Sequence, residues 1–126
     1  MNKHNESRLK RENVIWLVTA GSDRRPQAVP VWYLWDGKSF LIYARPGAKV
    51  RHIKENPHVE VHLNTDEAGI VRASGYATIP KSEPPAHKSP AYLRKYRSQI
   101  LGLGMTVEQF AEKYRNAIRV RRLRFH

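Results

Sequence analysis

The sequence of 126 residues contains no cysteine, so disulfide bonds, thiolate nucleophiles and cysteine-ligated metals are excluded. It also lacks the long apolar run that a membrane-spanning helix requires. The first residues, MNKHNESRLKREN, are charged and have no apolar centre, which is not the pattern of a secretory signal. These absences lead us to expect a cytoplasmic protein with no membrane contact.

Acidic residues are also scarce, with 11 Asp and Glu against 23 Lys and Arg, which gives a net charge of +12. Such a surface attracts polyanions, so nucleic acid, a phosphorylated cofactor and an acidic substrate are all candidates. The sequence contains no G-x-S-x-G, P-loop, H-E-x-x-H or G-x-G-x-x-G motif. No nucleophile–base pair can be assigned from spacing either, so the catalytic residues stay unassigned.

A metal site is not expected. His58, Glu60 and His62 alternate along a predicted strand and therefore share one of its sides. Two imidazoles and a carboxylate are zinc ligands, but alternate residues of one strand lie far apart for a single tetrahedral ion. We interpret this side of the strand as facing solvent.

The remaining pattern predicts a mainly β fold with short helices, in one domain over residues 1–126. Residues 1–12 are expected to form a polar N-terminal arm or helix, and residues 80–116 a loop and helical insertion before the last strand. Hairpin-like links between sequential strands favour a small six-stranded antiparallel barrel. The predicted strands lie at about 14–19, 28–35, 38–44, 58–63, 70–79 and 117–125, and the predicted helices at about 48–55, at 92–101 and from 106.

The stretch AVPVWYLWDG, residues 28–37, places a proline in an otherwise apolar strand. Proline cannot donate to a strand ladder, so Pro30 is expected at an edge or a bulge, and a ligand or a partner chain would cover the strand. Asp36-Gly37 predicts a two-residue hairpin loop, which would pair Trp35 with Lys38.

Three further local signals are present. Gly75 lies on the apolar side of its strand, which indicates a bulge or a close backbone approach. The apolar phase of the last strand switches between Val120 and Leu123, which predicts a bulge at 121–122. Thr106-Val-Glu-Gln109 fits a helix capping box.

The best candidate site is ARPGAKVRHI, residues 44–53, where a strand ends, a Pro-Gly turn follows and a helix begins at once. The N–H groups at a helix N-terminus attract anions. Lys49 lies in the first helical turn between Arg45 and Arg51, and Gly47 lets a ligand approach the backbone. The segment is either a phosphate cradle or an ordinary surface helix with solvated cations.

Two other groups of residues have two interpretations each. The first group is aromatic and comprises Trp32, Tyr33, Trp35, Phe40 and Tyr43. These side chains either stack on a flat ring system of a ligand or pack in the barrel core or a dimer interface. The basic run 119–124 either tracks a nucleic-acid backbone or forms an ordered strand that supplies arginines to an anionic pocket.

The order of these parts resembles the split β-barrel superfamily of pyridoxamine 5'-phosphate oxidase and flavin reductase. The resemblance lies in VIWLVT, in PQAVPVWYLWDGKSFLIYARPGAKVRHIKENPHVEVHL and in ASGYATI. It is strongest over residues 14–79 and looser at the terminal strand, and the nearest branch is that of small probable flavin- or deazaflavin-dependent enzymes.

The resemblance implies a homodimer with two cofactor sites at the subunit interface. Lys49 would contact the cofactor phosphate, the flavin ring would lie along residues 29–32, and the ribityl-phosphate tail along residues 43–45. The cofactor-binding residues implied in this way are Val29, Pro30, Val31, Trp32, Tyr43, Ala44, Arg45, Gly47, Ala48 and Lys49.

Two departures from the family pattern argue against oxidation of vitamin B6. Gly47-Ala48 replaces the Ser-Arg of the true oxidases, and Arg122-Leu-Arg-Phe125 lacks their proline. Residues 80–104 match no part of the pattern and are the candidate wall of a substrate pocket.

The leading hypothesis is a flavin- or deazaflavin-dependent oxidoreductase that transfers hydride between its cofactor and a small-molecule substrate. The cofactor is FMN or, alternatively, the deazaflavin coenzyme F-420. A second hypothesis is a non-catalytic barrel that binds flavin, deazaflavin or haem, with His52, His58 and His62 as candidate haem ligands. A basic nucleic-acid-binding barrel ranks last.

Overall fold

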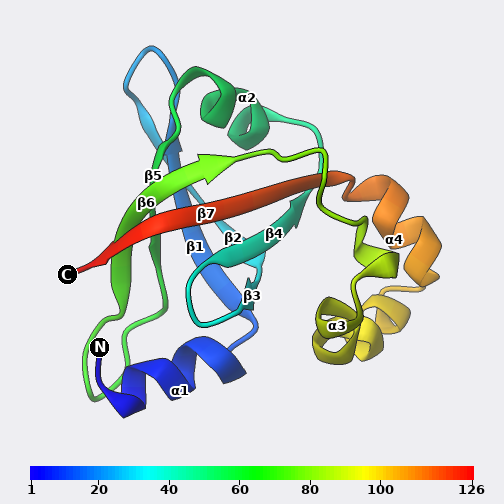
Figure 1. Ribbon diagram of the computed structural model, residues 1–126, viewed down its shortest axis with the longest axis horizontal. Coiled ribbons are helices and arrows are strands. Elements are labelled where there is room, and N and C mark those ends of the chain that lie inside the picture. Colours follow the sequence, from blue (N-terminus) through cyan, green and yellow to red (C-terminus); the bar gives the residue numbers. More distant parts are fainter.

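Seven strands form one antiparallel sheet in the order β2-β1-β5-β6-β7-β4-β3, which curls into a half-open barrel (Figure 1). The computed structural model describes residues 1–126. The strands are β1 (Val14–Ala20), β2 (Pro26–Trp32), β3 (Leu34–Trp35), β4 (Phe40–Ala44), β5 (His58–His62), β6 (Arg72–Thr78) and β7 (Asn116–Phe125). The helices are α1 (Lys3–Arg11), α2 (Ala48–Glu55), the 3-10 turn η1 (Ala86–Lys88), α3 (Pro90–Gly102) and α4 (Val107–Lys113). The expected mainly β split barrel is confirmed, with seven strands in place of six.

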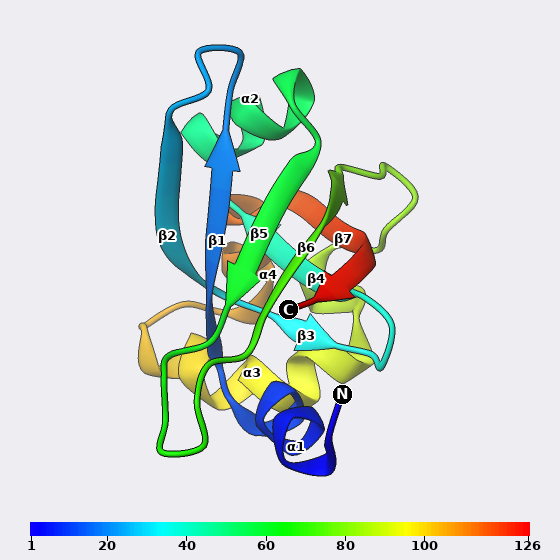
Figure 2. The same cartoon turned by 90° about the vertical axis from the view of Figure 1, so that its left-hand side faces the viewer.

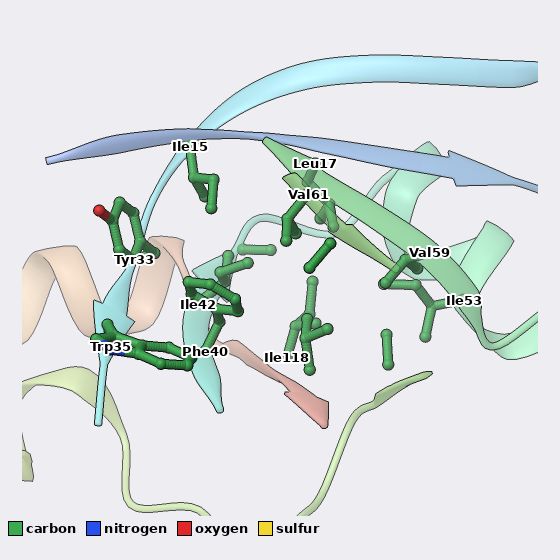
Figure 3. Packing of buried hydrophobic residues seen from close by; sticks show 14 of the residues in the cluster. Ile15, Leu17, Tyr33, Trp35, Phe40, Ile42, Ile53, Val59, Val61 and Ile118 are labelled. Atoms are coloured by element: carbon green, nitrogen blue, oxygen red, sulfur yellow. The ribbon is translucent and has the colours of Figure 1, made fainter. Parts of the chain in front are cut away.

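The barrel interior is a cluster of 18 buried hydrophobic residues. Alternate side chains of β1, β4, β5 and β7 point inward because the side-chain period of a strand is two residues. Figure 3 shows this for Ile15, Leu17, Ile42, Val61 and Ile118. No helix in the chain has the length and hydrophobicity of a membrane-spanning segment.

A second hydrophobic cluster lies outside the barrel, where η1, α3 and α4 cover the other face of β4. Phe40, Ile42 and Ala44 of β4 point into the barrel, whereas Leu41 and Tyr43 join the second cluster. All five residues of β4 are therefore buried. The helices of this cluster lie together at one end of the molecule (Figure 1). We call the two groups the barrel core and the helical core.

Strand β2 lies at the edge of the sheet, as Figure 2 shows, and Pro30 is opposite Trp16 of β1. An edge strand has no ladder partner on one of its sides, so it tolerates a residue without an N–H group. The prediction that Pro30 marks an edge is confirmed.

The predicted continuous strand 28–35 is interrupted at Tyr33, which separates β2 from β3. The backbone of Tyr33 bonds to the Tyr96 side chain of α3. A helix placed by the distant insertion therefore ends β2, and this interruption accounts for the seventh strand.

The two-residue hairpin loop was a wrong prediction, because Trp35 pairs with Phe40 and not with Lys38. The Asp36 carboxylate accepts hydrogen bonds from the backbone N–H groups of Lys38 at 2.8 Å and Ser39 at 2.7 Å. It also accepts the Ser39 hydroxyl at 2.9 Å. These bonds close a four-residue turn and displace every cross-strand pair predicted from the shorter loop.

The close approach at Gly75 is confirmed, and β7 has the predicted bulge one residue later than expected, at 122–123; the two are one feature. Ser74 pairs with Arg124 and Tyr76 with Arg121, so β7 carries one extra residue opposite Gly75. Arg122, inside the bulge, has a positive φ of 53°. A Cβ at Gly75 would lie 2.9 Å from the Arg121 carbonyl oxygen, so this position excludes larger residues.

The polar N-terminal segment forms helix α1 and not a loose arm. Arg8 is 2% exposed, and its Nε lies 2.6 Å from Glu12 Oε2 and 3.3 Å from Asp66 Oδ2. Its guanidinium also donates to the Asn64 and Gly69 carbonyl oxygens. Arg8 therefore fastens α1 to the connection between β5 and β6.

Candidate functional site

The N-terminus of α2 carries no capping side chain and no acidic residue in its first turn. Strand β4 ends at Ala44, and α2 begins four residues later at Ala48 with Gly47 as its N-cap. The first N–H groups of a helix have no intrahelical acceptor and carry a partial positive charge. The turn and helix start predicted as a phosphate cradle are therefore present, and the first N–H groups of α2 are free to bind an anion.

Lys49 is a half-buried cation with no counter-ion. Burial lowers the pKa of its amino group, and the nearby Arg45 lowers that pKa further. No ion pair or side-chain hydrogen bond in the chain involves Lys49. An anion bound there would stabilise the charged form of the amino group.

Lys49 lies at the rim of an apolar cavity of about 180 Å³. The cavity is lined by Pro30, Val31, Trp32, Tyr43, Ala44, Lys49, Tyr92, Leu103, Phe110 and Tyr114. Lys49 also borders an adjoining hollow of about 210 Å³, whose other lining residues are Thr19, Gln27, Val29 and Ala48. Lys49 thus borders two neighbouring concave surfaces.

Stacked aromatic rings form much of the cavity wall. Trp32 stacks on Tyr96, with ring centroids 4.8 Å apart and 6° between the planes, and on Phe110 at 5.6 Å and 17°. Phe110 in turn stacks on Tyr114 at 4.5 Å. Flat rings already held in parallel offer a flat ligand a preformed apolar surface.

The structure gathers most of the implied cofactor-binding residues. Pro30, Val31, Trp32, Tyr43, Ala44 and Lys49 line the cavity, and Val29 and Ala48 line the adjoining hollow. Arg45 and Gly47 line neither, although Gly47 is the N-cap of α2 and Arg45 is close enough to influence Lys49. Contact of these residues with a cofactor stays a prediction.

The aromatic set divides between the two cores. Trp32 and Tyr43 line the cavity, whereas Tyr33, Trp35 and Phe40 are buried in the barrel core. Alternation along the strand, together with the break at Tyr33, turns neighbouring rings toward different cores.

Sequence reasoning missed that α3 and α4 supply a wall of the cavity, with Tyr92, Leu103, Phe110 and Tyr114. Phe110 and Tyr114 lie four positions apart, which is the spacing of residues on one helix face, but nothing local indicates what that face covers. The wall depends on packing between segments far apart in the sequence, and residues 80–104 gave only a general indication of it.

The histidine strand and the basic run lie away from the cavity. His58 and Glu60 of β5 are exposed, and His62 stacks on Trp16 with ring centroids 6.2 Å apart. No group of three or more His, Asp or Glu side chains gathers in a metal-binding arrangement. In β7, Arg119 is drawn into ion pairs with Glu83 at 2.5 Å and Asp36 at 3.3 Å, so part of the basic run is structural.

A family model for pyridoxamine 5'-phosphate oxidase matches residues 1–125. The chain therefore belongs to the pyridoxamine 5'-phosphate oxidase family, in agreement with the resemblance given above. No curated protein sequence matches the chain.

Three solved structures illustrate the range of this fold. An F-420 reductase is 25% identical, with a TM-score of 0.71 over 100% of this chain and 98% of that one. The haem storage protein HutZ of Vibrio cholerae is 11% identical, with a TM-score of 0.63 over 94% and 88% of the two chains. An FAD-binding protein of Mesorhizobium loti is 17% identical, with a TM-score of 0.61 over 94% and 84%.

Proposed function

We propose that the protein is an oxidoreductase that binds FMN or the deazaflavin coenzyme F-420 in this cavity and exchanges hydride with a small-molecule substrate. One observation carries the proposal: an unpaired, half-buried cation and an uncapped helix N-terminus lie at the rim of an aromatic cavity. A flavin-type cofactor requires both, since its phosphate is anionic and its ring system is flat and largely apolar on its faces.

The residues present fit such a cofactor. Lys49 and the first N–H groups of α2 would hold the phosphate, and the space within 4 Å of a Cβ built on Gly47 is open. Exposed Arg45 adds a second cation beside the turn where the true oxidases carry Ser-Arg. Trp32 and Val31 would lie against the ring, and the packed aromatic wall would keep water from it.

A bound flavin or deazaflavin supplies the hydride chemistry, and the chain supplies binding, orientation and electrostatics. The cavity lining contains no histidine and no carboxylate. We therefore assign no acid or base among the cavity residues, and the work of the chain is to place the ring and neutralise the phosphate.

We also propose that the active form is a homodimer whose partner subunit covers the open side of the cavity. Leu103 lines the cavity and is nevertheless 57% exposed, and Leu101 nearby is 55% exposed. Exposed leucines beside a ligand cavity are typical of surfaces that a second chain covers. Sedimentation equilibrium with and without FMN tests this point, and a monomer under both conditions would contradict it.

Haem is the weaker alternative. Its support is the fold shared with a haem storage protein. Of the candidate ligands, His52 bonds through Nδ1 to the Thr19 hydroxyl at 3.0 Å, and His58 and His62 lie on β5. None of the three lines the cavity, so a haem held there would lack an axial histidine from this chain.

The test is a visible absorption spectrum of the purified protein, followed by parallel titrations with FMN, coenzyme F-420, haem and a DNA duplex. We expect saturable binding of FMN or F-420, and reoxidation of the bound reduced cofactor by an electron acceptor. Haem binding alone, or tight and steeply salt-dependent DNA binding without any flavin, would overturn the proposal.

A further inference from the structure

Tyr92 of α3 has an unsatisfied hydroxyl within a residue that lines the cavity. The side chain is 0% exposed, and its hydroxyl has no hydrogen-bond partner in the chain. Buried polar atoms of folded proteins nearly always have a partner, so an exception calls for a physical explanation.

The neighbouring tyrosines show the contrast. The Tyr43 hydroxyl donates to the Pro84 carbonyl oxygen at 2.7 Å, and the Tyr33 hydroxyl donates to the Leu9 carbonyl oxygen at 2.8 Å. Tyr92 meets rings instead, with the centroids of Tyr43 and Tyr96 at 4.8 Å and 4.7 Å. These rings give the Tyr92 side chain apolar contact but no hydrogen-bond partner.

The protonation state of Tyr92 is fixed by the same surroundings. Burial raises the pKa of its hydroxyl, and the nearby Tyr96 raises that pKa further. The hydroxyl therefore keeps its proton throughout the neutral range, where it both donates and accepts hydrogen bonds.

We propose that Tyr92 is a specificity-determining residue whose hydroxyl bonds a carbonyl oxygen or ring nitrogen on the edge of the bound ring. The inference rests on the proposed function and adds a second recognition point. Lys49 selects for the anionic end of the ligand, and Tyr92 selects for a flat ring with polar edge atoms over a plain aromatic hydrocarbon. Recognition of the ring then comes from the inserted helix α3, outside the barrel strands.

The substitution Tyr92→Phe separates this role from a structural one, because the two roles predict opposite changes in the Tm of the ligand-free protein. Removing an unsatisfied buried hydroxyl removes its desolvation cost from the ligand-free protein. We therefore expect the Tm to stay level or rise by roughly 2–6 °C. The same variant loses a bond to the ligand, so we expect affinity for FMN and for riboflavin to fall by about three- to tenfold. The matched control is Tyr43→Phe, which removes a satisfied hydroxyl and should lower the Tm.

The outcomes are distinguishable. Unchanged affinity of Tyr92→Phe for FMN and riboflavin, when the wild type binds them, overturns this inference and leaves the proposed function standing. A fall in Tm of ligand-free Tyr92→Phe equal to that of Tyr43→Phe also overturns it, because the hydroxyl then has a partner inside the chain. A loss of affinity for FMN but not for riboflavin contradicts the contact with the ring. Failure of the wild type to bind FMN, riboflavin and F-420 overturns the proposed function and this inference with it.

Discussion

The Tyr96 hydroxyl of α3 bonds to the backbone of Tyr33 in the gap between β2 and β3. It accepts the Tyr33 N–H at 2.9 Å and lies 2.6 Å from each of the Tyr33 and Asn13 carbonyl oxygens, to one of which it donates. At this point a side chain supplies the hydrogen-bond partners that the backbone of a neighbouring strand would otherwise provide. The Tyr96 ring stacks on Trp32 as well, so one residue ends a strand and supports the cavity wall.

Tyr96→Phe should therefore lower the free energy of unfolding by about 1–3 kcal/mol, because it leaves the buried Tyr33 N–H without an acceptor while keeping the ring. Urea unfolding followed by far-ultraviolet circular dichroism measures the change. The control is Tyr76→Phe, at a tyrosine that is 39% exposed on the sheet. Equal losses in the two variants would show that the Tyr33 bonds contribute nothing specific.

Lys49→Ala should weaken FMN binding by about 10- to 100-fold, since a charge-assisted bond to the phosphate is lost. Riboflavin has no phosphate, so its affinity should change little. Fluorescence titration with both ligands gives the comparison. Lys54→Ala removes an exposed lysine from the last turn of the same helix and should leave both affinities near wild type. A parallel loss of riboflavin affinity in Lys49→Ala would place the phosphate elsewhere.

Lys95 makes the free energy of unfolding depend on pH in the alkaline range. Burial lowers the pKa of its amino group from 10.5 to about 8, and its Nζ lies 4.0 Å from the Tyr33 ring centroid. Between these pKa values the unfolded chain holds a proton that the folded chain has released, so the Lys95 contribution to stability rises with pH over that window. Above about pH 10 the raised pKa values of Tyr33 and Tyr96 act in the opposite direction, because their unfolded forms lose protons first.

The variant Lys95→Met removes the titrating amino group together with its hydrogen bond to the Tyr33 carbonyl oxygen. Its free energy of unfolding relative to wild type should therefore be highest near neutral pH and should fall as the pH approaches about 9.5. Urea unfolding of both proteins at each pH measures the difference. A constant difference would mean that Lys95 keeps an ordinary pKa in the folded protein.

Gly75→Ala should destabilise the sheet by about 1–3 kcal/mol through overpacking. The added Cβ would lie 2.9 Å from both the Arg121 carbonyl oxygen and Leu123 Cδ2. Gly102→Ala is the control, because nothing lies within 4 Å of a Cβ there. Differential scanning calorimetry should show a lower Tm for the first variant alone, and similar Tm values would mean that the bulge relaxes without cost.

The sequence predicted those features whose causes are local. Helix α2 has the predicted bounds of Ala48–Glu55, and Thr106 and Gln109 form the predicted capping box. The bulge in β7 also followed from the strand's own apolar phase. In each case, the determining contacts lie within a few residues of one another or within one strand's pattern.

Features that depend on distant segments were missed or wrong. The break at Tyr33 requires Tyr96, which is 63 positions away. The hairpin register depends on how the Asp36 side chain bonds, and Asp-Gly by itself does not specify that choice. The half of the candidate site on β2, β4 and α2 could be predicted from the family resemblance, whereas the half on α3 and α4 required the structure.

The alternation of β4 between two hydrophobic cores has a consequence for how this scaffold can diversify. Substitutions on α3 and α4 alter the wall of the cavity while the side chains that set strand register stay untouched inside the barrel. The cavity wall and the barrel core are thus formed by largely separate sets of residues, with Tyr96 as a link between α3 and the sheet. Substitutions in the insertion can therefore change the shape of the cavity while the turn between β4 and α2 stays unchanged.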